Sequence, residues 1–171
     1  TSPSRNVAAS PDRRSVFSTV SLTASIACTI LLSRATLASA RIGELSPVRE
    51  EFFQLELPDG AVVDGWMMFP PDFDPDAGTW PLLMHVYGEP AGTTVNDRWG
   101  SASQLWHRLL AQEGYVVASI DNRGTPAPKG RAWRKSVYGE IGVLASADQA
   151  HAVLGLIERH PWIDSERVGI W

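Results

Sequence analysis

Apolar and polar residues alternate along two short neighbouring segments in the middle of the chain, and we predict that these segments form a β-hairpin. Phe52–Leu57 alternates roughly residue by residue, and Val62–Phe69 continues as a second strand. Pro58-Asp59-Gly60 lies between them, and these residue types favour a tight turn. The pattern therefore predicts two antiparallel strands joined at this turn.

Further along the chain, apolar segments alternate with segments of helical character. Leu82–Tyr87, Tyr115–Ile120 and Arg167–Trp171 are mainly apolar, as strands of a buried parallel sheet are. Ser101–Glu113 and Ser146–Arg159 separate them and carry apolar residues at helical spacing. Each connection is long enough for a right-handed strand–helix–strand crossover. The fold class predicted is α/β.

The spacing also predicts which side of each helix faces the sheet. The first helix is expected to end at Gly114 and the second at Pro161. The inward side chains are expected to be Leu105, Leu109 and Gln112 in the first helix and Ala147, Ala150, Leu154 and Ile157 in the second. Between the two helices, a stretch rich in glycine and proline at residues 124–130 is expected to be a stiff, irregular loop.

Residues 1–45 have a different character, being rich in Ser, Thr and Ala. Short strands separated by turns are predicted near Ser15-Val16-Phe17 and Thr29–Leu32, which is typical of the end of an all-β unit. Arg13 and Arg14, a weakly apolar run and Ala38-Ser39-Ala40 also outline a signal peptide. Six Ser and Thr residues within that run argue against this alternative.

Composition excludes some functions and leaves others open. The chain has 171 residues, of which 44% are hydrophobic and 20% charged, an ordinary globular balance. Its net charge of −4 argues against a nucleic-acid-binding protein, which normally has a basic face. A single cysteine, Cys28, permits no internal disulfide and does not indicate a redox compartment. Periplasmic, secreted and cytoplasmic locations all remain open.

Three motifs are more specific than the general pattern. They are His85–Pro90 after a buried strand, Ser119–Thr125 after the next strand, and His160–Trp171 at the end of the chain. Gln112–Val117 and Tyr138-Gly139-Glu140 accompany them. In this order and spacing the motifs resemble the prolyl oligopeptidase family of serine peptidases, most closely its bacterial dipeptidyl peptidase IV branch. Ser10-Pro11-Asp12 is similar, more weakly, to the closing blade of that family's β-propeller.

The resemblance implies a division of the chain and an activity. Residues 1–45 would be the end of a β-propeller, and residues 46–171 the N-terminal portion of an α/β-hydrolase domain. A nucleophile elbow, which exposes a serine on a sharp strand-to-helix turn, would follow Trp171. The Ser-Asp-His triad would then lie beyond this chain, and the fragment alone would be inactive. The implied partners are a peptide substrate and, through the full-length protein, a second copy in a homodimer.

The implied reaction is the release of N-terminal dipeptides after proline or alanine. An acylaminoacyl peptidase or an esterase with the same sheet is an alternative, and a non-catalytic binding protein is another. Neither a cofactor nor a metal is implied.

Four residues are candidates for the site. The resemblance implies that Tyr87 donates its hydroxyl to the oxyanion hole, where acyl transfer builds negative charge. Glu89 replaces a glycine usual in the family, and its carboxylate either alters the turn or contacts a substrate amine. Arg98 and Arg123 are candidates for the wall of the substrate site. For Arg123, with Asp121, an ion pair that anchors the loop is the favoured alternative.

The four histidines are interpreted as structural or exposed residues. His107 and His151 lie on predicted helices without a second ligand one turn away, and His85 lies in a strand. His160 is expected at a helix end, where a positive charge suits the helix dipole. The spacing of zinc ligands is not present in the sequence.

Overall fold

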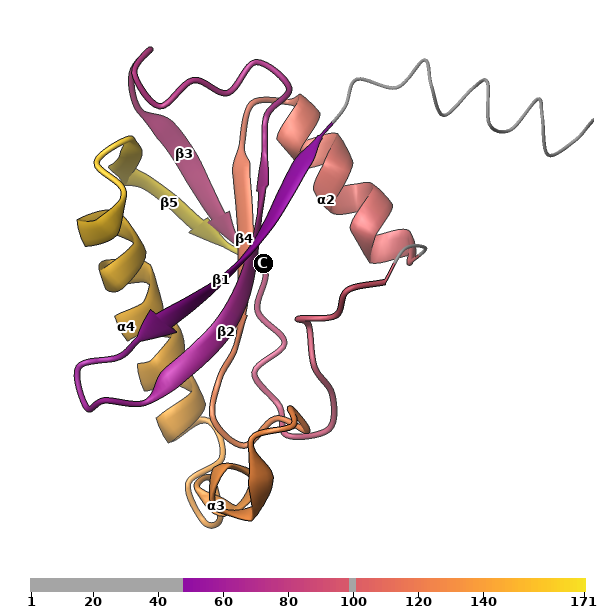
Figure 1. Ribbon diagram of the computed structural model, residues 1–171, viewed down its shortest axis with the longest axis vertical. Coiled ribbons are helices and arrows are strands. Elements are labelled where there is room, and N and C mark those ends of the chain that lie inside the picture. Colours follow the sequence, from indigo (N-terminus) through magenta and orange to yellow (C-terminus); the bar gives the residue numbers. More distant parts are fainter. Residues whose placement is uncertain (1–47, 99–100) are drawn as a thin grey trace, which may run out of the picture. The chain divides into compact units, whose positions relative to one another are not determined.

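A computed structural model of the chain describes residues 48–98 and 101–171, which belong to one compact unit. Its main feature is a sheet in the order β1-β2-β4-β3-β5 (Figure 1). The strands are β1 Arg49–Glu56, β2 Val62–Phe69, β3 Trp80–Met84, β4 Val116–Asp121 and β5 Ile163–Ile170, and the helices are α2 Ala102–Gln112, α3 Gly130–Lys135 and α4 Val143–Arg159. The predicted propeller remnant, its signal-peptide alternative and the predicted boundary at residue 45 lie outside the described residues.

The predicted hairpin is confirmed. β1 and β2 are antiparallel and in continuous register from Arg49 opposite Phe69 to Glu56 opposite Val62. The turn closes with a 2.8 Å hydrogen bond from the Leu57 amide to the Ala61 carbonyl. Gly60 has a φ of 83°, a conformation that glycine adopts without the steric cost borne by other residues. The alternating pattern and this turn are therefore sufficient to place β2.

The hairpin continues into a parallel sheet through β4, the central strand. β4 is antiparallel to β2 and parallel to β3, and β3 is parallel to β5. The carboxyl ends of β3 and β4 therefore lie at the same edge, as the sequence predicts for strands joined by helical crossovers. That edge carries the loops that contain the candidate site.

Helices cover both faces of the sheet, α4 on one side and α2 on the other (Figure 1). β2 contributes side chains to the hydrophobic cores on both faces of the sheet, because successive side chains of a strand point to opposite faces. Met67 and Phe69 join the larger core, which includes Ala152 and Leu156 of α4. Trp66 and Met68 join the smaller core, which includes Ala111 of α2.

The predicted inner side of the first helix is wrong. Leu105 and Leu109 are 57% and 45% exposed, whereas His107 and Ala111 are buried. The His107 ring lies 4.9 Å from the ring of Trp66, which projects from β2. Contact with this side chain turns a polar residue inward, so a count of apolar positions selects the wrong side of α2.

The predicted inner side of the second helix is also wrong in part. α4 begins at Val143, three residues earlier than predicted, and Leu154 is 63% exposed. Asp148 and Gln149 are buried together with Ala152 and Leu156. Because both polar side chains bind groups at the end of β4, they occupy positions that an apolar pattern assigns to solvent.

Other differences concern element boundaries. β5 begins at Ile163 rather than Arg167, and β3 ends at Met84 rather than Tyr87. The stretch predicted as an irregular loop ends in the short helix α3, which begins at Gly130. Here the Arg134 side chain donates to the Pro90 and Gly124 carbonyls, contacts distant in sequence that local residue types do not reveal.

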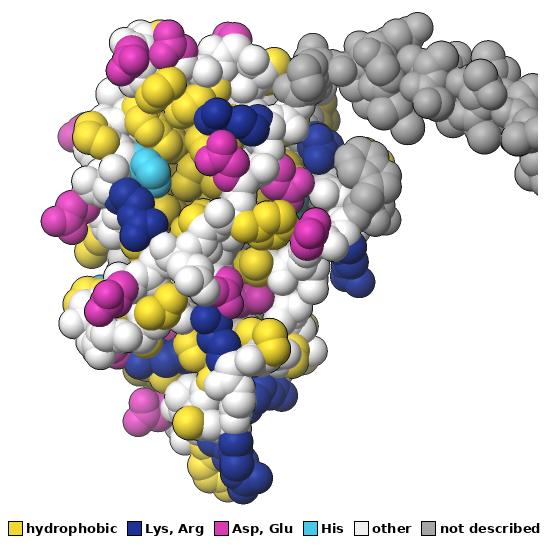
Figure 2. Space-filling model, viewed as in Figure 1, with side chains coloured by type: hydrophobic (Ala, Val, Ile, Leu, Met, Phe, Trp, Pro, Cys, Tyr) yellow, Lys and Arg dark blue, Asp and Glu magenta, His cyan; other side chains and the backbone are white. Residues whose placement is uncertain are grey.

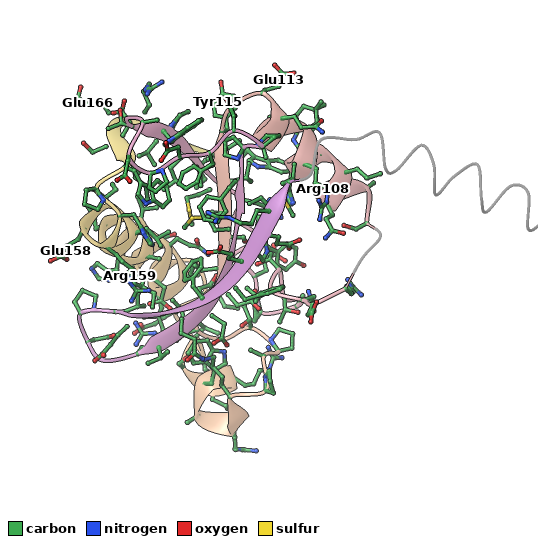
Figure 3. All side chains as sticks on the ribbon, turned by 45° about the horizontal axis from the view of Figure 1, so that its top comes forward. Arg108, Glu113, Tyr115, Glu158, Arg159 and Glu166 are labelled. Carbon is green, nitrogen blue, oxygen red and sulfur yellow. The ribbon has the colours of Figure 1, made fainter. Side chains whose placement is uncertain are left out.

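The amino end of the parallel strands lies opposite the edge that carries the candidate site. Glu113 and Tyr115, at the turn from α2 into β4, and Glu166 in β5 lie at the amino end of the parallel strands (Figure 3). Acidic and basic side chains are interspersed on the face seen in Figure 2, together with hydrophobic patches. Tyr87 lies at the opposite, carboxyl end.

Candidate active site

Tyr87 lies just beyond the carboxyl end of β3, at the edge where α/β sheets place ligands. The two preceding residues are still held by the sheet. The His85 amide donates to the Ala118 carbonyl at 2.8 Å, and the Val86 amide donates to the Trp171 carbonyl at 3.1 Å. Gly88 then turns the chain with a φ of 76°. Tyr87 is 46% exposed and lies where a ligand can reach it.

Tyr87 borders two hollows. One, of about 370 Å³, is also lined by Trp66, His85 and Arg98. The other, of about 560 Å³, is lined by Glu89 and by apolar side chains of α4 and β5. A third hollow, at the amino end of the parallel strands, is lined by Glu113 and Tyr115 and by none of the predicted site residues among those described.

The structure thus brings together three of the four predicted site residues. Glu89 is exposed beside Tyr87 on the second hollow, and Arg98 is exposed on the first. Among the described residues, Arg123 stands apart because it lines neither of these two hollows. Its position reflects a different set of contacts.

Arg123 is held between two carboxylates. Its Nη2 donates to Asp148 Oδ1 at 2.6 Å, its Nε lies 3.1 Å from Asp148 Oδ2, and its backbone amide donates to Asp148 Oδ2 at 2.9 Å. Its Nη1 lies 2.6 Å from Oδ2 of Asp59, in the turn between β1 and β2. These contacts fit the loop-anchoring alternative, although the partners are Asp148 and Asp59 rather than Asp121.

The pKa shifts agree with this anchoring. Hydrogen bonding to Asp148 is the main cause that raises the pKa of Arg123, while the Ala61 amide and then Arg123 lower the pKa of Asp59. Asp148 is fully buried, so its charge depends on Arg123 for compensation. Sequence reasoning missed Asp148. Its spacing of three and four residues from Ala145 and Ala152 places it on the same side of α4 as these alanines, but the sequence did not show that this side faces the sheet.

Asp121 instead holds the loop that follows Tyr87. Its Oδ1 accepts from the Thr94 amide at 2.7 Å, and its Oδ2 accepts from the Val95 amide at 3.4 Å. Burial raises the pKa of this carboxyl, while the hydrogen bonds from Thr94 act in the opposite direction. Next to it, the Asn122 side chain donates to the Gly88 carbonyl at 3.4 Å.

Two histidines that are far apart in the sequence meet beside the first hollow. The ring centroids of His85 and His107 are 4.7 Å apart, and each ring also lies against Trp171. Burial lowers the pKa of His85, and burial followed by the charge of His85 lowers that of His107 to about 4. Both imidazoles are therefore neutral at pH 7.

This cluster predicts a pH dependence of stability. The folded-state pKa of His107 lies below its ordinary value, so the unfolded chain takes up the proton first as the pH falls. The contribution of His107 to the free energy of unfolding should therefore decrease between pH 6.5 and pH 4, and then level off. A shift from 6.5 to about 4 corresponds to at most about 3 kcal/mol. Urea denaturation of the full-length protein at a series of pH values measures this decrease.

The matched variant is His107→Phe, which keeps an aromatic ring in the cluster and removes the titrating group. Its unfolding free energy should fall less steeply over the same interval. His151→Gln, a change at an exposed histidine, should follow the wild-type curve. Parallel curves for the wild type and His107→Phe would contradict the assignment.

The remaining histidine predictions have mixed outcomes. His160 caps the C-terminus of α4 as expected. However, burial and then the charge of Arg159 lower its pKa, so the expected positive charge at the helix end is wrong near pH 7. Within residues 48–98 and 101–171, no group of three or more His, Cys, Asp or Glu side chains is placed to hold a metal ion.

Comparison with known proteins shows which family the chain resembles. A model of the prolyl oligopeptidase family matches residues 102–171. A protein of Aspergillus flavus named "Probable dipeptidyl peptidase 4" is 35% identical over 121 residues, covering 70% of this chain and 15% of that protein. Dipeptidyl peptidase 4 of Trichophyton equinum is 32% identical over 132 residues, covering 77% of this chain and 17% of that protein.

A solved structure gives the same result. The crystal structure of Porphyromonas gingivalis dipeptidyl peptidase 4 superimposes with a TM-score of 0.65 at 38% sequence identity, over 72% of this chain and 17% of that one. The fold is that of an α/β-hydrolase, and residues 102–171 match the prolyl oligopeptidase family. The predicted likeness to its dipeptidyl peptidase IV branch is confirmed. The chain spans 15% to 17% of the length of these relatives.

The structure also bears on membrane-spanning segments. In the part of the chain that it describes, no helix combines the length and the apolar character needed to cross a membrane.

Proposed function

We propose that the full-length protein is a serine-type peptidase that releases N-terminal dipeptides, and that Tyr87 donates a hydrogen bond in its oxyanion hole. The observation that carries this proposal is the position of Tyr87. Tyr87 is exposed at the carboxyl end of a parallel strand, and the backbone before it is hydrogen-bonded to Ala118 of β4 and to Trp171, which follows β5. The names of the relatives, dipeptidyl peptidase 4, support the same reaction.

The chemistry explains why a donor at this place matters. In a serine peptidase the serine oxygen attacks the scissile carbonyl carbon, its proton passes to the histidine, and the carbonyl oxygen becomes negative. Collapse of this intermediate breaks the C–N bond, and the histidine returns the proton to the leaving amine. A fixed hydroxyl from Tyr87 would stabilise the negative oxygen as it forms. The triad itself would come from other parts of the full-length protein.

The other predicted site residues receive smaller roles. Glu89 makes no hydrogen bond or ion pair with another described residue, so its carboxylate beside Tyr87 is available to a substrate ammonium group. Arg98 remains a candidate for the wall of the first hollow. For Arg123 we favour anchoring over substrate contact, because two carboxylates engage its guanidinium. The homodimer stays a prediction.

A panel of substrates tests the proposed reaction in the full-length protein. Dipeptide p-nitroanilides with proline or alanine in the second position should be hydrolysed. The same compounds acetylated at the amino group should not be, because a dipeptidyl peptidase needs the free amine. Preferential hydrolysis of the acetylated compounds would favour an acylaminoacyl peptidase, and activity on simple esters alone would favour an esterase.

Glu89→Gln distinguishes the two roles considered for Glu89. If the carboxylate contacts the substrate amine, its loss should raise KM for the free dipeptide anilide by about tenfold and leave kcat within about twofold, as expected when uniform binding is removed. Glu166→Gln, at the other end of the sheet, is the matched control (Figure 3). A change in kcat without a change in KM would show instead that Glu89 shapes the turn.

A further inference from the structure

The loop after β3 carries Tyr87 but has no regular secondary structure from residue 85 to residue 98. Thr93, Asn96 and Arg98 form hydrogen bonds within the loop, but the backbone on either side of Tyr87 depends on hydrogen bonds from neighbouring elements. The position of Tyr87 must be held firmly, because an oxyanion donor contributes fully only when it is in place before the negative charge develops. The question is which groups hold the loop.

Ser119 is one such group. It lies in β4 between apolar residues and is fully buried. Its hydroxyl donates to the His85 carbonyl at 2.6 Å, two residues before Tyr87, and lies 2.8 Å from the Thr94 hydroxyl. A buried hydroxyl without a partner costs about 1–3 kcal/mol, so these contacts determine how the serine is oriented.

Asp121 and Thr94 hold the part of the loop that follows Tyr87 in the sequence. The Thr94 hydroxyl lies 3.1 Å from Asp121 Oδ1, so it can donate either to this oxygen or to the Ser119 hydroxyl. Asp121 also accepts from the Thr94 and Val95 amides. The carboxylate is 3% exposed, and hydrogen bonds to a buried carboxylate are among the strong ones.

The loop is therefore tied to β4 both before and after Tyr87. His85 is bound on the N-terminal side, and Thr94 and Val95 are bound on the C-terminal side. We infer that the cluster of Ser119, Thr94 and Asp121, in which Ser119 and Asp121 are buried and Thr94 is half-buried beside the first hollow, positions Tyr87 for catalysis. The inference rests on the function proposed above, because it concerns the same hydroxyl. In this view the three residues act through Tyr87 and not on the reacting atoms.

Variants of Thr94 in the full-length protein test the inference. Thr94→Val keeps the shape of the side chain and removes the hydroxyl, so it should lower kcat for a dipeptide p-nitroanilide by about tenfold with little change in KM. Thr94→Ser retains the hydroxyl and should keep kcat close to that of the wild type. Ser136→Ala, which removes a hydroxyl bonded to the Trp133 carbonyl in the α3 region, is the matched control.

A double-mutant cycle separates positioning from a general structural effect. If Thr94 acts through Tyr87, adding Thr94→Val to Tyr87→Phe should change kcat by no more than about twofold, because the donor is already missing. Independent, multiplicative losses would overturn the inference. If Thr94→Val does not fold, as judged by urea denaturation, Ser119→Ala takes its place in the same cycle.

The outcomes distinguish the inference from the proposed function. If Tyr87→Phe lowers kcat strongly while Thr94→Val and Ser119→Ala do not, the positioning role is wrong and the oxyanion role stands. If Tyr87→Phe leaves kcat nearly unchanged, the oxyanion role is wrong, and positioning through Tyr87 is excluded with it.

Discussion

Tyr87→Phe is expected to lower kcat of the full-length protein by about 100- to 1,000-fold, the effect of removing one oxyanion-hole donor. Phenylalanine keeps the aromatic ring, which lies next to Gly92, and removes only the hydroxyl. KM for the dipeptide anilide should change little, because the donor acts mainly on the charge of the transition state. Steady-state kinetics on one chromogenic substrate measures both values.

Tyr115→Phe provides a matched control. Tyr115 is also partly exposed, but it lies at the turn between α2 and β4, at the opposite end of the sheet (Figure 3). The same loss of a hydroxyl there should leave kcat unchanged. A reduction of less than about threefold for Tyr87→Phe would contradict the oxyanion assignment, since a working donor has a far larger effect.

Arg123→Met is expected to decrease the free energy of unfolding by about 3–5 kcal/mol, the usual effect of removing one partner of a buried ion pair. Asp148 is fully buried and would be left with an uncompensated charge, apart from its bond with the backbone amide of residue 123. Methionine retains the length of the side chain, so little packing is lost. Urea denaturation followed by tryptophan fluorescence measures the difference.

Arg167→Met is the matched control for this change. Arg167 lies 2.6 Å from Asp164, a distance equal to that between Arg123 and Asp148, but its side chain is 54% exposed. Its loss should cost about 1 kcal/mol or less, because solvent screens exposed pairs. Adding Asp148→Leu to Arg123→Met should recover part of the lost stability. Equal losses for Arg123→Met and Arg167→Met would contradict the anchoring role.

These predictions depend on features of different kinds. The place of Tyr87 after a buried strand could be predicted from the chain itself, because the motif and the apolar segment before it are continuous in sequence. The contacts of Arg123 could not be predicted from the sequence. Its partners, Asp59 and Asp148, lie 64 residues before it and 25 residues after it, and no local pattern selects them from the other acidic residues.

The sequence by itself determined the hairpin, the alternation of strands and helices that followed it, and the resemblance to the prolyl oligopeptidase family. A strand's alternation, a turn's residue types and a helix's spacing are local properties, so β2 was predicted with its observed bounds. The tertiary structure alone decided which sides of α2 and α4 face the sheet. In both helices polar side chains, His107 in one and Asp148 in the other, turned inward toward partners on other elements. Burial of a polar group depends on such distant partners, and a pattern of apolar residues contains no information about them.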